Sequence, residues 1–353
     1  MIKFALLGCG RISSRHAELL SGGQIKNAKL IAVCDKEKDK ADFLSKKYNC
    51  KSYQNITEMM KENEIDIVSV LTESGNHCKH AIELSKFNVH VIVEKPMALK
   101  VSDAKKMIKI FQSKKLKLFV VKQNRFNPAV LKLKKTLINK SLGKIFLGTI
   151  RVRWKRDNDY YLKDKWRGTW QLDGGVLANQ AIHHIDLLEW MVGDVKSVYA
   201  KSIKALARIE AEDTAIVILK FKNGALGLIE VTTATRPRDL EGSLSILGSK
   251  GTVELGGFAV NEIKNWFVDK NKQTNKINRK KYLTLPPNVY GFGHKSFYEN
   301  VIKSIKGKPN IVTFGKDGIK SLILVNAIYK SIELNREVFI GSGNHKSKLG
   351  RTK

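Results

Sequence analysis

The sequence has few cysteines, few prolines and no long hydrophobic run. Its four cysteines form no CxxC pair, which argues against a zinc ribbon, a thioredoxin-type redox motif and a disulfide-dense scaffold. We expect all of them to be reduced thiols. Only 6 prolines and a hydrophobic fraction of 42% exclude a collagen-like or wholly disordered chain. No apolar stretch reaches the roughly 18 residues of a membrane-spanning helix. The short run Phe4–Leu7 lacks the features of a secretory signal, so we expect a cytoplasmic protein.

Acidic residues are also scarce. Lys and Arg number 64 against 33 Asp and Glu, which gives a formal net charge of +31. Such a balance points first to nucleic acid or another polyanion. However, the lysines are spread over the faces of predicted helices, and no zinc finger, basic zipper or RNA-binding aromatic signature occurs. Two segments are locally dense: 264–281, which resembles a hairpin tip, and 341–353. We favour a Lys-biased surface without a nucleic-acid partner, and polyanion binding is the alternative.

Short apolar runs alternate with helical patterns through residues 1–122. Strands that are apolar along their whole length and alternate with helices are typical of a parallel sheet covered on both faces. The sequence therefore predicts a doubly wound α/β domain with a parallel sheet over residues 1–122. Its expected strands include Ile2–Leu7, Lys29–Val33, Ile65–Leu71, Val89–Val93 and Leu116–Val121.

The pattern changes in residues 123–340, where strands alternate between apolar and polar positions. This alternation predicts an α+β domain with a large, mostly antiparallel open sheet. Asn223-Gly224 between two apolar runs is a hairpin signal. We expect residues 341–353 to form a disordered basic tail. Helices are expected at Gly175–Val192, His294–Lys306 and Lys316–Asn335.

A glycine-rich turn, Gly8-Cys9-Gly10-Arg11-Ile12-Ser13, follows the first predicted strand and opens the first helix. A glycine at position 8 permits the tight turn, and one at position 10 lets the backbone approach a pyrophosphate at the helix N-terminus. Ser13 is small enough for close packing of the helix on the strand. We predict a dinucleotide site here, and a purely structural turn is the alternative.

Asp35 follows the second predicted strand. Its carboxylate would accept hydrogen bonds from the adenosine ribose hydroxyls, and its charge would repel a 2′-phosphate. This favours NAD over NADP, although the neighbouring cation Lys36 could tolerate the phosphate. A helix N-cap is the alternative role for Asp35.

Glu94-Lys95-Pro96 ends the strand predicted at Val89–Val93. Ligands bind outside the carboxyl ends of the strands in this architecture. An amine held beside a nicotinamide ring could hydrogen-bond or exchange a proton with a substrate hydroxyl. The alternative for Lys95 is a surface lysine at a strand end.

The helix expected after Gly174-Gly175 carries Asn179, His183, His184 and Asp186. Positions 179 and 183 would share one helix face. A histidine there can act as the general base in alcohol oxidation, and a core or interface histidine is the alternative. The His doublet with Asp186 raises a metal site, but HExxH spacing and a third ligand are both lacking. We therefore predict no metal.

Together these motifs resemble the glucose–fructose oxidoreductase/inositol dehydrogenase/MocA (Gfo/Idh/MocA) family over nearly the whole chain. The matching pieces are Gly8–Ile12 with His16, Asp35, Ser74–His77, Glu94–Pro96, Gln123–Pro128, and Gly174-Gly175 through Asp186.

The resemblance implies a Rossmann domain, an antiparallel-sheet domain that often mediates dimers or tetramers, and NAD(P)-dependent oxidation of a sugar or polyol hydroxyl. It assigns Lys95 to the substrate hydroxyl and His183 to acid–base work, with a cis bond before Pro96. The cofactor-binding residues that we expect are Gly8, Gly10, Arg11, Ile12, Asp35, Ser74, His77, Glu94, Lys95, Pro96 and Gln123.

Two positions depart from the family pattern. Many members have Asp where this chain has Asn179, and members often have Pro where it has Glu73. An Asn cannot act as a base, so more of the proton transfer falls on His183 and Lys95. The Asn variant is similar to the branch that oxidises nucleotide-activated amino sugars at carbon 3.

The segment Arg151–Trp170 fits a large anionic substrate of that kind. Its arginines can grip a pyrophosphate or carboxylate, and its aromatic rings can stack on uracil or sugar rings. A cationic strand face with core aromatics is the alternative. The substrate-binding residues that we expect are Arg153, Tyr161, Trp166, Arg167, Asn179 and His183.

The favoured hypothesis is NAD-dependent oxidation at carbon 3 of a UDP-N-acetylated hexose or its uronate, in the synthesis of surface-polysaccharide sugars. One alternative is an inositol or free-hexose dehydrogenase of the same family. Another is a non-catalytic regulator that binds dinucleotide. Loss of the lysine or the histidine would favour the regulator, but both Lys95 and His183 are present.

Overall fold

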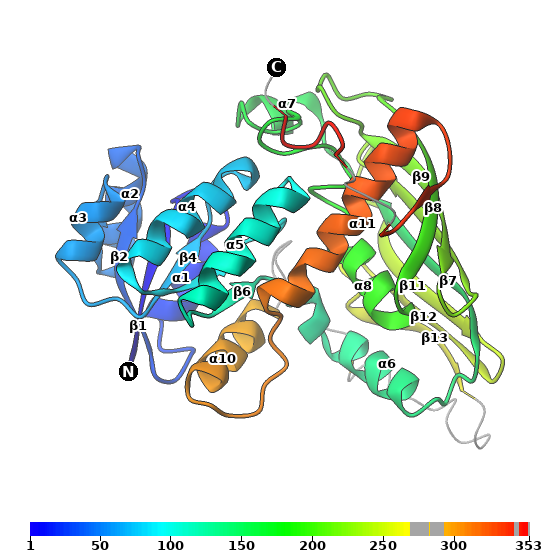
Figure 1. Ribbon diagram of the computed structural model, residues 1–353, viewed down its shortest axis with the longest axis horizontal. Helices are drawn as coiled ribbons and strands as arrows, with labels where there is room; N and C mark the ends of the chain where they lie inside the picture. The colour runs from blue at the N-terminus through cyan, green and yellow to red at the C-terminus, as the bar shows by residue number, and fades with distance from the viewer. Residues whose placement is uncertain (269–281, 283–292, 342–345, 352–353) are drawn as a thin grey trace. The chain divides into compact units, whose positions relative to one another are not determined.

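The structure is a computed structural model that describes residues 1–268, 282, 293–341 and 346–351. Contacts divide the chain into two units, the first made of Met1–Gln123 with Phe292–Ile319 and the second of Asn124–Gly291 with Lys320–Lys353 (Figure 1). The sequence predicts an unbroken second domain over 123–340. The structure instead returns a segment near the C-terminus to the first unit, which makes that unit discontinuous.

The first unit contains a six-stranded parallel sheet in the order β3-β2-β1-β4-β5-β6. All four residues of β4 are buried, because both faces of the sheet are covered. This confirms the predicted doubly wound α/β class. The strands are β1 (Ile2–Leu7), β2 (Ala28–Cys34), β3 (Lys51–Tyr53), β4 (Ile67–Val70), β5 (His90–Val93) and β6 (Leu118–Val120). The helices are α1 (Ser13–Ser21), α2 (Lys38–Tyr48), α3 (Ile56–Lys61), α4 (His77–Leu84), α5 (Val101–Ser113) and α10 (Gly293–Ile305).

Helix α10 belongs to the first unit because it fills part of that unit's core. Phe297 and Tyr298 are fully buried, and the Tyr298 ring packs edge-on against Phe4 of β1 with the ring centroids 5.6 Å apart. Farther along the chain, Phe314 contacts Phe119 of β6, with the centroids 5.3 Å apart. The residues in these contacts lie far apart in the sequence, so no local sequence pattern predicts that they pack together.

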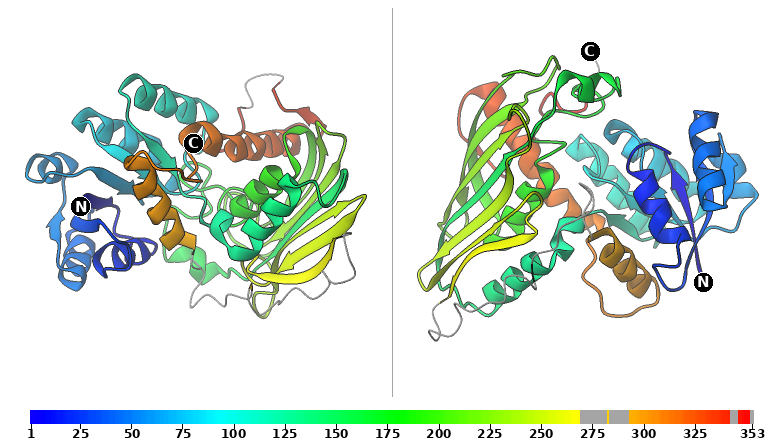
Figure 2. Two further views of the ribbon diagram at one scale, coloured as in Figure 1. Left: turned by 90° about the horizontal axis from the view of Figure 1, so that it is seen from below. Right: turned by 180° about the vertical axis from the view of Figure 1, so that it is seen from behind.

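The second unit is built on an eight-stranded sheet in the order β13-β12-β11-β7-β10-β9-β8-β14, in which only the β7–β10 pair is parallel. Helix α8 packs on one face of β7 and β11, as Figure 2 shows. The predicted large, mostly antiparallel sheet is confirmed. The strands are β7 (Ile145–Arg153), β8 (Val195–Ile203), β9 (Thr214–Phe221), β10 (Leu226–Thr232), β11 (Glu241–Gly248), β12 (Gly251–Gly256), β13 (Glu262–Val268) and β14 (Val338–Phe339). The helices are α6 (Pro128–Ile138), α7 (Asn158–Leu162), α8 (Ile182–Val192) and α11 (Gly315–Leu334), which begins in the first unit.

The helix predicted from Gly175 starts seven residues later, at Ile182. Gly174 has a φ of +88°, and the backbone N–H groups that follow are already bound elsewhere. Val176 N–H donates to the backbone oxygen of Glu212 at 3.0 Å, and Leu177 N–H donates to its carboxylate at 3.0 Å. Glu212, from another part of the chain, therefore binds N–H groups in the segment where the sequence predicts the first helical turn.

The C-terminal residues that the structure describes are packed, which corrects the predicted disordered tail for Lys346–Arg351. Leu349 is only 1% exposed, and the Lys348 N–H donates to the Glu333 carboxylate at 2.6 Å. A buried apolar side chain and hydrogen bonds together anchor this short basic segment. Within the predicted basic hairpin tip at 264–281, residues 264–268 belong to β13 and residues 269–281 lie outside the described residues.

Other sequence predictions hold. The four cysteines are free thiols. Asn223-Gly224 forms the tight turn between β9 and β10, with Gly224 at a φ of +90°. No helix in the described part of the chain is both long and apolar enough to cross a membrane.

Asp213 anchors the loop before β9. Its buried carboxylate accepts the N–H groups of residues 205, 206 and 207, each at 2.7 Å. Burial alone would raise the pKa of Asp213, but these hydrogen bonds outweigh burial and lower it.

We expect Asp213→Ala to lower the free energy of unfolding by about 2–4 kcal/mol, because three N–H groups lose their acceptor. Asp194 pairs at the surface with Lys222 and Lys320, and Asp194→Ala should cost less than about 1 kcal/mol. Since the Asp213 pKa is lowered in the fold, its contribution should be present at neutral pH and disappear as the pH falls through the carboxyl range. Thermal and urea unfolding of both variants between pH 4 and pH 8 measures these differences. Equal losses in the two variants would contradict this account.

Candidate functional site

The predicted dinucleotide residues meet at the carboxyl ends of β1, β2, β4 and β5. Gly8 follows β1, and its N–H donates to the Cys34 oxygen at the end of β2 at 2.8 Å. Gly8 has a φ of +100°, and a Cβ there would lie 2.8 Å from the backbone of Leu71 and Thr72. The fold itself therefore requires glycine at position 8.

Gly10 has a different reason to be glycine. A Cβ at this position would meet nothing within 4 Å, so packing inside the protein does not exclude a side chain. The open space lies at the loop before α1, where Ser13 donates to the Gly10 oxygen at 2.5 Å. An exposed backbone that can be approached closely fits the pyrophosphate of a dinucleotide. Arg11 is exposed and Ile12 half-buried in the same loop.

Asp35 is half-buried directly after β2 and connects the glycine-rich loop to the start of α2. Its carboxylate accepts the N–H of Cys9 in the glycine-rich loop at 2.7 Å and that of Glu37 at 2.9 Å. The N-cap of α2 is Glu37, so the N-cap alternative for Asp35 does not hold. The neighbouring Lys36 pairs with Glu73, with its nitrogen 3.6 Å from a carboxylate oxygen. Glu73, which departs from the family pattern, thus partly neutralises the cation that could otherwise receive a 2′-phosphate.

The Glu94-Lys95-Pro96 corner follows β5 at the same edge. Lys95 is half-buried, and the Lys95–Pro96 bond is cis, as the resemblance implied. His77 lies under this corner, with Nδ1 2.8 Å from the Pro96 oxygen and Nε2 3.0 Å from the Thr72 oxygen. Burial lowers the pKa of His77. Ser74 is buried at the end of the loop after β4, and Gln123 is buried after β6.

One group of metal-type ligand atoms lies together in the described residues. These atoms belong to His16, Glu94 and His294 and are all within 4.8 Å of one another. The Nε2 atom of His16 is 3.1 Å from Glu94 Oε1, and that of His294 is 3.6 Å away. The 3.1 Å separation is a hydrogen-bond distance and the 3.6 Å separation is an electrostatic contact, so we interpret the group as two imidazoles clustered around a carboxylate.

In the second unit, Asn179 and His183 are both buried. Asn179 lies in the turns before α8, so the predicted helix face shared with His183 does not form. Its amide nitrogen donates to the carboxylate of Asp173, whose other oxygen accepts the Gly168 N–H at 2.8 Å. Asp173 therefore orients the Asn179 amide, a role that the sequence analysis missed.

His184 behaves as a core residue. It is 0% exposed, its ring packs edge-on against Trp154, and burial lowers its pKa to about 4. Asp186 makes a two-point ion pair with Arg125 at 2.8 and 2.9 Å. A neutral core imidazole and a neutralised carboxylate explain these neighbours of His183 without a metal.

The arginines expected to grip an anionic substrate do not gather in one place. Ile150 and Val152 of β7 are buried, whereas Arg151 and Arg153 point to the opposite face of the sheet from α8. Arg153 pairs with Glu230 at 2.6 and 2.9 Å and with Glu241 at 3.1 Å. Strand alternation thus separates Arg153 from the helix that carries His183, and its charge is matched on the outer face.

The other predicted substrate residues lie around α7. The Tyr161 side chain is buried, with its hydroxyl 3.1 Å from that of Thr233. Arg167 donates to Asp164 at 2.8 Å and to the Tyr160 hydroxyl at 2.8 Å. Its guanidinium also lies 4.6 Å from the centre of the half-buried Trp166 ring. Tyr161 is thus a core residue here. The Arg167 guanidinium is held by the Asp164 carboxylate, the Tyr160 hydroxyl and the Trp166 ring.

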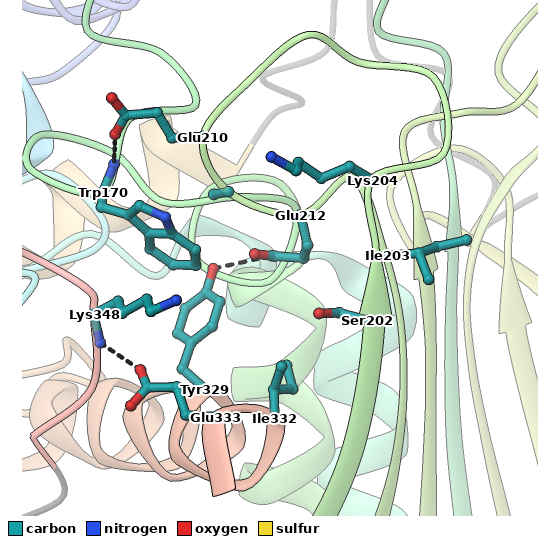
Figure 3. Close-up of a pocket in the computed structure, with 11 residues that line it drawn as sticks. Trp170, Ser202, Ile203, Lys204, Glu210, Glu212, Tyr329, Ile332, Glu333 and Lys348 are labelled. Carbon is teal, nitrogen blue, oxygen red and sulfur yellow. Dashed lines mark hydrogen bonds between the residues drawn. The ribbon is translucent and has the colours of Figure 1, made fainter. Parts of the chain in front are cut away.

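A hollow of about 400 Å³ lies in the second unit, with Trp170, Tyr329 and several charged side chains around it (Figure 3). Glu212, on its wall, is only 4% exposed and accepts the Tyr329 hydroxyl at 3.0 Å. Burial raises the pKa of Glu212 to about 7. Sequence reasoning missed Glu212, because it lies in an unremarkable stretch of chain and becomes special only through burial. The sequence analysis also missed Tyr298 in the first unit, which stands out only through its burial.

Comparison with known proteins gives a consistent result. Residues 2–122 match the family model described as "Oxidoreductase family, NAD-binding Rossmann fold", and residues 134–340 match "Oxidoreductase family, C-terminal alpha/beta domain". The chain is 40% identical to the WlbA dehydrogenase of Chromobacterium violaceum, solved with NADH and UDP-GlcNAcA, with a TM-score of 0.90 over 97% of this chain and 96% of that one.

Two further relatives cover nearly the whole chain. The WlbA dehydrogenase of Bordetella pertussis, also solved with NADH and UDP-GlcNAcA, is 38% identical, with a TM-score of 0.92 over 97% of this chain and 98% of that one. The myo-inositol 2-dehydrogenase of Thermotoga maritima is 28% identical over 96% of this chain and 98% of its own length.

Substitutions of Gly8 and Gly10 should distinguish a role in the fold from a role in cofactor binding. We expect Gly10→Ala to keep the wild-type melting temperature within about 2 °C, since a Cβ meets nothing within 4 Å, and to weaken NADH binding on the order of tenfold or more. Gly8→Ala, in contrast, should lower the melting temperature by several degrees because of its backbone angle. NADH fluorescence titration and thermal unfolding measure both effects. Unchanged NADH affinity in Gly10→Ala would contradict the cofactor assignment of this loop.

Proposed function

Because the chain belongs to the Gfo/Idh/MocA family of NAD-dependent oxidoreductases, we propose that it oxidises carbon 3 of a UDP-N-acetylated hexose or its uronate. This reaction would supply an activated sugar for surface-polysaccharide synthesis. The observation that carries the proposal is the higher identity to two enzymes solved with UDP-GlcNAcA, 40% and 38%, than to the inositol dehydrogenase, 28%.

The second candidate is an inositol or free-hexose dehydrogenase. It is supported by the match to the myo-inositol 2-dehydrogenase over 96% of this chain. The matched charges of Arg153 also favour it slightly, because they remove one expected contact to a pyrophosphate. A non-catalytic regulator has less support, since Lys95 and His183 are both retained.

The residues of the first unit fit NAD, which supplies the hydride acceptor when bound. Gly10 leaves room for a pyrophosphate, and Asp35 offers a carboxylate to the ribose hydroxyls. In the proposed reaction Lys95 binds the substrate hydroxyl and stabilises the alkoxide that develops there. His183 accepts the hydroxyl proton. Asn179, oriented by Asp173, is a neutral polar contact to the sugar rather than a base.

The decisive experiment is NAD reduction by the purified protein with UDP-N-acetylglucosamine, its uronate, myo-inositol and free glucose. A 2-oxo acid is added to empty any bound NADH. We expect turnover of a UDP-sugar, and we expect Lys95→Met to lower kcat by about 10²- to 10⁴-fold with NADH affinity little changed. Lys100→Met, an exposed lysine five residues away, is the matched control and should keep wild-type activity. Turnover of inositol or glucose in place of a UDP-sugar would overturn the substrate assignment.

We also propose that the protein is a homo-dimer or homo-tetramer that associates through the outer face of its eight-stranded sheet. No helix in the described part of the second unit covers this face in Figures 1 and 2. Ile216 and Ile218 of β9 are each 54% exposed, and Ile218 lies opposite Tyr199 on β8 and Leu228 on β10. Apolar side chains aligned on neighbouring strands form a surface suited to a second copy of the same face.

We expect Ile218→Asp to convert the assembly to a smaller species in size-exclusion chromatography with light scattering. The reason is that a carboxylate would have to be desolvated in the apolar contact. Ile311, which is 57% exposed in the first unit, provides the matched control, and Ile311→Asp should leave the assembly unchanged. A wild-type protein that is monomeric at micromolar concentration would refute this proposal.

A further inference from the structure

A buried chain of polar side chains in the first unit ends at the backbone of Lys95. Its members come from α1, β4, the end of β5 and α10, and none is more than 7% exposed. The proposed reaction uses none of these side chains directly. They are Ser69, Tyr298, His16, His294 and Glu94.

The carboxylate at the end of this chain fixes the proton positions on His16, Tyr298 and Ser69. Glu94 accepts the Lys95 N–H at 3.0 Å through Oε2, and its Oε1 is 3.1 Å from Nε2 of His16. An ionised carboxylate only accepts hydrogen bonds, so His16 must carry a proton on Nε2. A neutral imidazole then accepts at Nδ1, and the Tyr298 hydroxyl, 2.6 Å away, must donate to it. The Tyr298 oxygen in turn accepts from Ser69 at 2.9 Å.

The charge states agree with these proton positions. Burial lowers the pKa of His16, which keeps its ring neutral. Burial alone would raise the pKa of Glu94, but the imidazoles of His16 and His294 beside its carboxylate hold that pKa well below the usual range. The other charged or titratable groups that act on this pair are Arg15, beside His16, and His77, below the Lys95 corner. Glu94 is therefore a buried anion supported by imidazoles.

Buried side chains hold the backbone at Lys95 and at the next residue, Pro96. Glu94 binds the N–H of Lys95, and His77 Nδ1 lies 2.8 Å from the oxygen of Pro96. The path of the Lys95 side chain thus starts from a fixed point. A general acid–base or alkoxide-binding group needs such definition, since small displacements of a reacting group carry large rate costs.

We propose that His16, held in one tautomer by Tyr298, is a positioning residue for Lys95: it keeps Glu94 aligned and anionic, and Glu94 fixes the peptide group from which the lysine extends. The role of Lys95 itself rests on the function proposed above. His16 lies on α1, the helix that starts at the glycine-rich loop. The hydrogen-bonded system that supports Lys95 therefore includes a residue of the helix that follows the cofactor loop.

Tyr298→Phe is the mildest test, because it removes one hydroxyl and keeps the buried ring. His16 then loses the donor that fixes its tautomer. We expect the variant to stay folded and to bind NADH within about twofold of wild type. Its kcat should fall about tenfold, and the acid limb of its pH–rate profile should move to higher pH, because Glu94 loses support for its charge.

His16 variants test the same step more strongly. His16→Leu removes the donor to Glu94, and we expect kcat to fall about 100-fold. His16→Gln retains an N–H near the position of Nε2 and should recover part of the loss. His90 lies at the other end of β5, where its Nδ1 accepts the Lys117 N–H at 3.1 Å. His90→Asn is therefore the matched control and should keep the wild-type kcat and pH profile. Wild-type kcat and pH profile in both Tyr298→Phe and His16→Leu would overturn the proposal.

A measurement without substrate separates this proposal from the proposed function. Nitrogen-15 NMR of labelled histidine should show His16 as the Nε2–H tautomer, with no titration in the ordinary range of histidine, since burial lowers its pKa. Tyr298→Phe should convert it to a mixture of tautomers. A wild-type His16 that is protonated on Nδ1, or that titrates near its ordinary pKa, would refute the network whichever sugar the enzyme oxidises.

Discussion

A carboxylate can remain charged inside a protein only where donors surround it, and the first unit is arranged to meet that requirement at Glu94. The donors come from α1 and from the backbone of Lys95, with a second imidazole supplied by α10. The parallel sheet brings the glycine-rich loop, Asp35 and the Lys95 corner to one edge. The buried Glu94 carboxylate then fixes the backbone of the Glu94-Lys95-Pro96 corner.

The second unit depends on a simpler constraint, the two-residue alternation of side chains along a strand. On β7, Ile150 and Val152 pack beneath α8, the helix that carries His183. The residues between them, Arg151 and Arg153, reach the outer face and meet carboxylates there. One strand thus serves the interior of the unit with one set of side chains and its outer surface with the other.

Much of the first unit could be predicted from the sequence, because Gly8, Gly10, Asp35 and Glu94–Pro96 all stand where a short apolar strand ends. Such positions are set locally. Arg153 could not be placed in this way, since local alternation does not say which face of a sheet a helix will cover. The late start of α8 was equally hidden, because Glu212, from a distant loop, binds the N–H groups of the missing turn. The return of α10 depends on contacts far apart in sequence.

The discontinuity of the first unit has a consequence for synthesis on the ribosome. All six strands of its sheet are complete by residue 120, yet Tyr298 and His294 emerge only after most of the second unit has been translated. Until then the side chains that α10 covers stay uncovered, and His16 has no Tyr298 hydroxyl to fix its tautomer. The set of buried side chains that supports the Lys95 backbone is therefore complete only late in synthesis, although Lys95 itself is among the first hundred residues to be made.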